Sequence, residues 1–179
     1  EYLQDGGTCE DLFFVQCGIS VFELHRTLRA KGRSMKTCGA SNGQSLVGAF
    51  STGTHGAAFE VGAIHDSILG MHIVTGADRH VWVERASRPV ASPAFIQWLG
   101  AELVRDDAAF NAAVISFGSF GLVNGVMMET EPLFLLEEHR LDNLPYDDAL
   151  SAVMTRLDFS GIEALLPVPV DDPVRRLYH

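Results

Sequence analysis

The sequence is poor in cysteine and in basic residues, and it has no long apolar run. Its three cysteines, Cys9, Cys17 and Cys38, are odd in number and follow no metal-ligand spacing, which is typical of reduced thiols in a cytoplasmic protein. Only 13 lysines and arginines stand against 23 acidic residues, so the net charge is −10 and no nucleic-acid partner is expected. No segment approaches the roughly 18 apolar residues of a membrane-spanning helix, so no membrane partner is expected either.

The chain has 179 residues, of which 47% are apolar and 17 are glycines. That length corresponds to one globular domain with part of a second. The chain begins with Glu1 rather than methionine, which we interpret as the sign of a piece of a longer protein. An anionic cofactor remains compatible with the acidic composition, provided that backbone N–H groups and helix N-termini hold its phosphates.

Periodicity and capping patterns predict an α+β fold, with a mostly antiparallel sheet flanked by helices. Ser20 and Glu23 form a capping-box pattern, and Ser92 followed by Pro93 marks the start of a helix that we expect to extend to Leu103. The other expected elements are a strand at 12–17, a helix at 20–31, a short helix at 46–50, an antiparallel hairpin at 67–85 with Leu69, Met71 and Ile73 on one face, a short helix from 106, a strand at 122–131 in the same sheet and a helix at about 146–157.

The composition changes toward the end of the chain. Residues 137–140 are charged, and residues 166–173 are rich in proline, which is typical of an extended segment. We therefore place a domain boundary near Leu141, which separates residues 1–140 from residues 141–179.

The stretch 39–56 combines five glycines with hydroxyl and amide side chains around one short apolar run. Ser45 is placed to cap a short helix over that run, and Gly53 is placed to end it. Glycine allows a backbone to approach another group closely, so such a stretch can surround a polar ligand with backbone groups. The alternative is a glycine-rich turn that binds no ligand.

Two segments resemble a known family. Residues 44–56, which end in Ser-Thr-Gly-Thr-His-Gly, are similar to the flavin-contacting segment of FAD-linked oxidases of the vanillyl-alcohol oxidase and p-cresol methylhydroxylase type. Their closest counterparts are in the branch of aldonolactone, alditol and sterol oxidases. Residues 117–126 resemble the strand of that family whose backbone contacts adenine, although Asn124 and Gly125 replace the usual residues.

The resemblance implies FAD as the cofactor, and a fold that corresponds to the second lobe of a PCMH-type FAD-binding domain within residues 1–140. Ser45 would cap its helix near the flavin, the segment 51–56 would lie along the flavin and pyrophosphate, and the segment 121–123 would border the adenine. The implied cofactor-binding residues are Ser45, Gly48, Ser51, Thr52, Gly53, Thr54, His55, Gly56, Gly121, Leu122 and Val123. The resemblance identifies no catalytic residue.

The implied function is that of an FAD-dependent oxidoreductase acting on CH–OH groups. Hydride would pass from an alcohol, sugar lactone or sterol-like substrate to the flavin, which oxygen or another acceptor would reoxidise. We expect the amino-terminal lobe with its pyrophosphate-binding loop to be missing, and residues 141–179 to be the start of a substrate domain or a linker. The chain alone is therefore expected to be inactive and to bind FAD weakly or not at all.

The residues also allow other functions. A second hypothesis is a cofactor-binding module that serves a larger redox enzyme without activity of its own. A metal hydrolase would need converging ligands, and although His72 and His80 could be neighbours across the hairpin, no metal site is expected. A hydrolase using Ser67, His65 and Asp66 lacks the Gly-x-Ser-x-Gly pattern. His55 could transfer protons, but the resemblance assigns it to cofactor packing.

Overall fold

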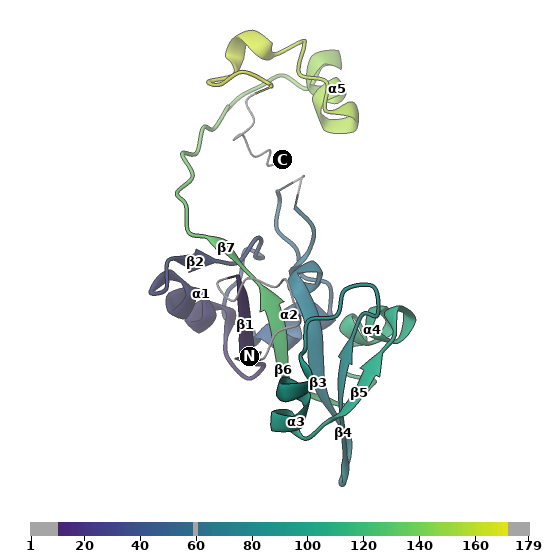
Figure 1. Ribbon diagram of the computed structural model, residues 1–179. Coiled ribbons are helices and arrows are strands. Elements are labelled where there is room, and N and C mark those ends of the chain that lie inside the picture. Colours follow the sequence, from purple (N-terminus) through teal and green to yellow (C-terminus); the bar gives the residue numbers. More distant parts are fainter. Residues whose placement is uncertain (1–10, 59–60, 172–179) are drawn as a thin grey trace. The chain divides into compact units, whose positions relative to one another are not determined.

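The computed structural model describes residues 11–58 and 61–171 (Figure 1). The described residues form two compact units, the first comprising 11–56 and 61–133 and the second 57–58 and 134–171. In these residues no helix is long and apolar enough to cross a membrane. The division falls after Leu133, a few residues before the expected boundary near Leu141, and the role of the second unit stays a prediction.

The first unit is built on a five-stranded sheet in the order β1-β6-β3-β4-β5 (Figure 1). Every pairing is antiparallel except that of β4 with β5, which is parallel and is connected through one helix. One parallel pair at the edge does not make a Rossmann sheet, so the expected α+β class is confirmed. The strands are β1 (Leu12–Gln16), β3 (Ile68–Gly76), β4 (Arg79–Glu84), β5 (Glu102–Arg105) and β6 (Leu122–Glu129), and β2 (Arg33–Ser34) pairs separately with β7 (Glu131–Pro132).

The helices begin where polar side chains cap their first turn. Ser20 and Glu23 form the predicted capping box at the start of α1, and Ser45, Ser92 and Asp106 accept hydrogen bonds at the starts of the next three helices. These helices are α1 (Val21–Arg29), α2 (Leu46–Ser51), α3 (Pro93–Leu99) and α4 (Asp107–Val114), and a 3₁₀ turn, η1, covers Ile64–Ser67.

Helix α3 is shorter than predicted. Gly100 adopts a left-handed conformation with φ 68° and ends the helix, and Leu103 lies in β5 instead of on a helix face. The expectation that Leu103 continues the apolar face of α3 was therefore wrong. A glycine at this position terminates a helix readily because it carries no Cβ that would clash in the left-handed conformation.

Each face of the sheet has its own apolar core. Helices α1, α2 and α4 contribute to the larger core with Met71 and Ile73, and α3 contributes to a smaller core around Trp82. Leu69 belongs to the smaller core, so the expectation that it shares a face with Met71 and Ile73 was wrong. A register shift between Ile68 and Gly70 explains the difference, because one extra residue reverses the side-chain alternation.

The second unit contains α5 (Asp148–Arg156), capped by Asp147, and a 3₁₀ turn, η2, over Glu163–Leu165. This confirms the helix predicted at about 146–157. Residues 133–136, an apolar run, lie in no helix or strand, and the side chain of Leu135 is 90% exposed.

A buried carboxylate joins the edge of the sheet to the segment before α3. One oxygen of Glu84 accepts hydrogen bonds from the indole of Trp82 at 2.9 Å and from the backbone N–H groups of Val90 and Ala91 at 3.1 and 2.9 Å. The other oxygen forms an ion pair with Arg105 at 2.7 Å. Every donor therefore converges on one fully buried charge that has no access to water.

We expect Glu84→Gln to destabilise the first unit by about 1–3 kcal/mol, because the amide N–H₂ that replaces one buried carboxylate oxygen cannot accept the hydrogen bonds that this oxygen accepts. Chemical denaturation followed by circular dichroism measures this change. The matched control is Glu102→Gln, which breaks an exposed ion pair with Arg79 on neighbouring strands and should change stability little. Equal effects of the two substitutions would contradict the role of burial.

Candidate functional site

The glycine-rich stretch folds around α2, whose first turn is already satisfied by the chain itself. The N–H of Leu46 donates to Ile19 O at 2.8 Å, and the N–H of Val47 donates to Cys17 O at 3.4 Å. The hydroxyl of Ser45 accepts from Gly48 N at 3.2 Å, as the capping pattern predicted. The N-terminus of α2 therefore offers no free N–H group to a phosphate, contrary to the general expectation for helix N-termini.

The end of α2 is equally well ordered. Gly53 has φ 75° and donates to Phe50 O at 3.1 Å, which confirms its predicted role in ending the helix. The N–H of Thr54 donates to Ala49 O at 3.0 Å, and the hydroxyl of Thr52 donates to Gly48 O at 2.7 Å. Hydrogen bonds within the chain itself therefore hold residues 51–54.

His55 and Gly56 differ from the residues before them. Within residues 11–58 and 61–171, their backbone N–H groups have no hydrogen-bond partner. The imidazole of His55 is exposed, and its Nδ1 lies 2.8 Å from the carbonyl of Gly56. Because a carbonyl only accepts, Nδ1 must carry the proton, which leaves Nε2 of a neutral His55 free to accept a hydrogen bond from a ligand.

Gly56 is required by the packing of the chain itself. A Cβ at this position would lie 2.6 Å from the carbonyl oxygen of Cys38 and 2.9 Å from the hydroxyl of Thr37. The start and the end of the stretch therefore lie side by side at Gly56. This adds a structural reason for the glycine to the one that the resemblance implied.

The second motif meets the first at the end of α2. The N–H of Phe117 donates to Ser51 O at 3.3 Å, and the backbone of Gly121, with φ 131°, lies directly against Val74 O. The loop 117–121 and the first residue of β6 expose apolar side chains, with 77% of Phe117 and 71% of Leu122 accessible. The structure thus places the exposed Phe117 beside the end of α2.

The predicted site residues differ in their accessibility. Thr52, His55 and Leu122 are exposed, whereas Ser51 and Val123 are buried and can face a ligand only through their backbone. The remaining predicted residues are half-buried; they are Ser45, Gly48, Gly53, Thr54, Gly56 and Gly121. The stretch 39–56 contains no charged residue, so any ligand here would be contacted by neutral groups.

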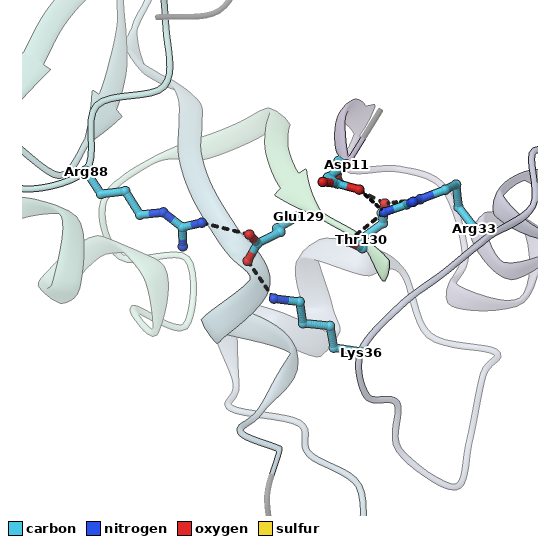
Figure 2. Close-up of polar contacts among 6 residues, drawn as sticks. All are labelled: Asp11, Arg33, Lys36, Arg88, Glu129 and Thr130. Atoms are coloured by element: carbon cyan, nitrogen blue, oxygen red, sulfur yellow. Dashed lines mark hydrogen bonds and ion pairs between the residues drawn. The ribbon is translucent and has the colours of Figure 1, made fainter. Parts of the chain in front are cut away.

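Ion pairs hold the segment that leads into this stretch (Figure 2). Glu129 at the end of β6 accepts from Lys36 and from Arg88, each at 2.7 Å. Beside it, Arg33 pairs with Asp11 and donates to Thr130. The sequence does not indicate these contacts, since the partners are far apart in the chain and leave no local pattern.

The other candidate chemistries find little support. Burial raises the pKa of Cys17 to about 12 and also raises the pKa of Cys38, so neither thiol is a ready nucleophile at neutral pH. No hydrogen bond joins Ser67 to His65 in the described part of the chain. His72 and His80 are indeed neighbours, with Nε2 and Nδ1 2.8 Å apart, but among the described residues no three potential ligands of a metal converge.

Comparisons with known proteins point to flavoproteins. Residues 8–84 match the family model of an FAD binding domain. D-arabinono-1,4-lactone oxidase from Candida glabrata is 28% identical over 120 residues, covering 67% of this chain and 19% of that protein. L-gulonolactone oxidase 3 from Arabidopsis thaliana is 29% identical over 119 residues, covering 65% of this chain and 18% of that protein. The chain spans about one fifth of the length of these curated relatives.

Solved structures share the fold. A carbohydrate oxidase from Microdochium nivale superposes with a TM-score of 0.53 at 22% identity, covering 69% of this chain and 22% of that one. A VAO-type flavoprotein from Myceliophthora thermophila superposes with a TM-score of 0.53 at 15% identity, covering 74% and 22%. These likenesses confirm the predicted α+β fold with a mostly antiparallel sheet.

The Glu129 cluster predicts a pH dependence of stability. Burial disfavours the charged carboxylate, yet the hydrogen bonds and charges of Lys36 and Arg88 outweigh it and lower the pKa of Glu129 below its ordinary 4.5. A lowered pKa in the folded state stabilises the fold above the ordinary pKa, and this contribution is lost as the pH falls through the folded value. Melting temperatures of the wild type and Glu129→Gln should therefore differ at pH 7, and the difference should shrink as the pH falls below 4.5 toward the folded pKa of Glu129.

The control for this measurement is Glu163→Gln, which changes an exposed glutamate that forms no described ion pair. Its melting temperature should follow the wild type at every pH. A gap between wild type and Glu129→Gln that persisted undiminished at pH 3 would contradict the ion-pair argument.

The close approach at Gly56 gives a second prediction. Gly56→Ala should destabilise the stretch by about 1–3 kcal/mol, because the new methyl group forces Cys38 to move. The matched control is Gly43→Ala in the same stretch, where a Cβ meets no atom within 4 Å and φ is not positive. Thermal unfolding should separate the two variants, and equal melting temperatures would show that the approach at Gly56 imposes no constraint.

Proposed function

We propose that this chain, a homologue of the FAD-linked lactone oxidases with the fold of the vanillyl-alcohol oxidase type flavoproteins, is part of the FAD-binding domain of an FAD-dependent oxidase. When bound, FAD accepts a hydride from a CH–OH group of the substrate and passes electrons to oxygen or another acceptor. The substrate class that the relatives suggest is a sugar lactone, an alditol or a similar alcohol. The motifs 44–56 and 117–126 indicated the same family to which these comparisons point.

The meeting of the two motifs at Ser51 is the observation that supports this proposal most strongly. The unpartnered N–H groups of His55 and Gly56 can donate to a polar edge of the cofactor. The exposed apolar side chains of residues 117–122 can cover a planar ring. The residues present therefore fit one face of FAD, with Gly121, Leu122 and Val123 beside the adenine.

His55 serves in this proposal to orient the cofactor. Its Nδ1–H is held by Gly56 O, so only Nε2 remains to contact the cofactor, and the ring cannot rotate without losing that bond. The substrate-binding groups and the proton-transferring groups would come from elsewhere in the full-length protein, because the stretch 39–56 contains no acid or base other than His55. The same observation favours a second candidate, a cofactor-binding module without activity of its own.

We further infer that the protein acts in the cytoplasm and has neither a nucleic-acid nor a membrane partner. The free thiols of Cys17 and Cys38 are consistent with a reducing compartment. The acidic composition argues against binding to a polyanion.

The test uses the full-length protein that contains this chain. It should be yellow, and anaerobic addition of a sugar lactone or an alditol should bleach the flavin absorption, which air then restores. Bound flavin that no member of a lactone, alditol and sterol panel reduces would favour the non-catalytic module. Absence of bound flavin after reconstitution with FAD would refute both proposals.

His55→Ala in the same protein should weaken FAD binding about tenfold, as expected for the loss of one hydrogen bond of about 1.4 kcal/mol. The rate of flavin reduction at saturating FAD should remain close to that of the wild type. Calorimetric titration and stopped-flow absorbance measure the two quantities separately. Loss of reduction with FAD still bound would assign proton transfer to His55 instead.

A further inference from the structure

The stretch 39–56 contains an asparagine–glycine pair that the proposed cofactor contacts do not use. Asn42 and Gly43 lie between β2 and α2, outside every helix and strand. Gly43 is exposed, and its backbone N–H has no hydrogen-bond partner in the ranges 11–58 and 61–171. A Cβ at Gly43 would meet no atom within 4 Å, so the space around this backbone is open.

The side-chain amide of Asn42 is not held through its oxygen. Asn42 is half-buried, and its Oδ1 is shielded from water, yet this oxygen accepts no hydrogen bond within the part of the chain that the structure describes. A buried amide oxygen without a donor lacks the interaction that would stabilise it in its present position. No hydrogen bond to Oδ1 therefore has to break when the amide turns toward Gly43.

We propose that Asn42 is a modification site, at which the side-chain amide is lost by spontaneous deamidation. The N–H of Gly43 gives its proton to hydroxide, and the nitrogen then attacks Cγ of Asn42 and forms a new C–N bond. Attack within the chain needs no encounter of two molecules, and glycine has no side chain to hinder the approach. The Cγ–Nδ2 bond breaks, and Nδ2 takes a proton from water and leaves as ammonia, so a succinimide ring remains.

Water opens that ring at either of its two carbonyl carbons. The products are aspartate, with the original backbone, and isoaspartate, in which the backbone runs through the former side chain. The net reaction consumes water and releases ammonia, and no group is oxidised or reduced. The reaction needs only the chain and water, so it does not depend on the proposed oxidase function.

The chain contains a second asparagine–glycine pair, Asn124 and Gly125, in a different setting. Both residues lie in β6, and Gly125 pairs with Gln16 on one side and with His72 on the other. The amide of Asn124 lies 3.1 Å from Nδ1 of His72, and a Cβ at Gly125 would lie 2.7 Å from the ring of Phe14. Ring closure here would disrupt a strand inside the sheet, so the fold protects this pair.

Ring closure at Asn42 disturbs less of the structure. The carbonyl of Asn42 accepts from Phe22 N at 2.9 Å, and the carbonyl of Gln44 accepts from Val21 N at 3.0 Å. These bonds hold the loop on either side of Gly43 without engaging the N–H of Gly43. Isoaspartate would add a methylene group to the backbone between them, so the two bonds to the first turn of α1 could not both keep their positions. Either product also brings a negative charge into the stretch 39–56, which otherwise has no charged residue.

The experiment incubates the folded 179-residue chain at mildly alkaline pH and follows both sites by peptide mass spectrometry after acidic digestion. We expect Asn42 to be converted at least about tenfold faster than Asn124, a ratio that takes only about 1.4 kcal/mol of activation free energy. In urea the two sites should react at similar rates, because the sheet no longer protects Asn124. Fragmentation of the peptides should show both aspartate and isoaspartate at Asn42.

The matched variant is Gly43→Ala, which has room for its Cβ and should fold like the wild type. It should slow the conversion of Asn42 about tenfold, because the added Cβ restricts the backbone that must approach Cγ. The isoaspartate form, separated by ion exchange, should melt at a lower temperature than the unmodified chain.

Three results would overturn the proposal. The first is conversion of Asn124 as fast as that of Asn42 in the folded chain, and the second is conversion of Asn42 only in urea. The third is formation of aspartate without isoaspartate, which would indicate direct hydrolysis of the amide without the ring.

Discussion

The pairing of β6 with both β1 and β3 is the constraint on which the first unit depends. Phe14 pairs with Met127 and Met71 pairs with Val126, so one strand joins segments that are distant along the chain. Its side chains alternate between the two cores, with Val126 in the larger and Met127 in the smaller. Because these contacts close long loops, the chain must lose conformational entropy before the contacts of the sheet can stabilise it.

The geometry of the candidate site depends on the position of β6. The loop 117–121 leads directly into β6, so the position of Phe117 beside Ser51 follows once β6 has paired with β3. Helix α2 is held in turn by backbone bonds to Ile19 and Cys17, between β1 and α1. The backbone groups around α2 are thus largely engaged in holding the stretch in place. The segment at His55 and Gly56, together with the exposed loop, remains able to contact a cofactor.

Local patterns in the sequence predicted the elements that local interactions determine. The capping box of Ser20 and Glu23, the cap at Ser45 and the left-handed Gly53 each involve neighbours within a few residues. The predictions that were wrong, for Leu69 and Leu103, share another cause. The bulge near Leu69 depends on the register against β6, and the assignment of Leu103 to a strand depends on pairing with β4.

The candidate site likewise has features that the local sequence predicts and features that depend on tertiary contacts. Its motifs were visible because their glycines and hydroxyls are contiguous in sequence, but the accessibility of each residue was not. The satisfied first turn of α2 requires Cys17 and Ile19, and the ion pairs of Glu129 require Lys36 and Arg88, which no periodicity relates to one another. Such contacts depend on tertiary structure, and a single sequence contains no local signal for them.

The apolar run at residues 133–136 has a consequence for how the chain behaves in concentrated solution. An extended, exposed segment of leucine and phenylalanine is a template for strand-to-strand association between copies. Glu131 precedes this run, and Glu137 and Glu138 follow it. Charged residues at such flanks act as gatekeepers, because stacking identical segments would bring like charges together. The net charge of −10 adds a general repulsion between copies of the chain. The acidic residues, none of which lies in the stretch 39–56, therefore oppose aggregation of the chain.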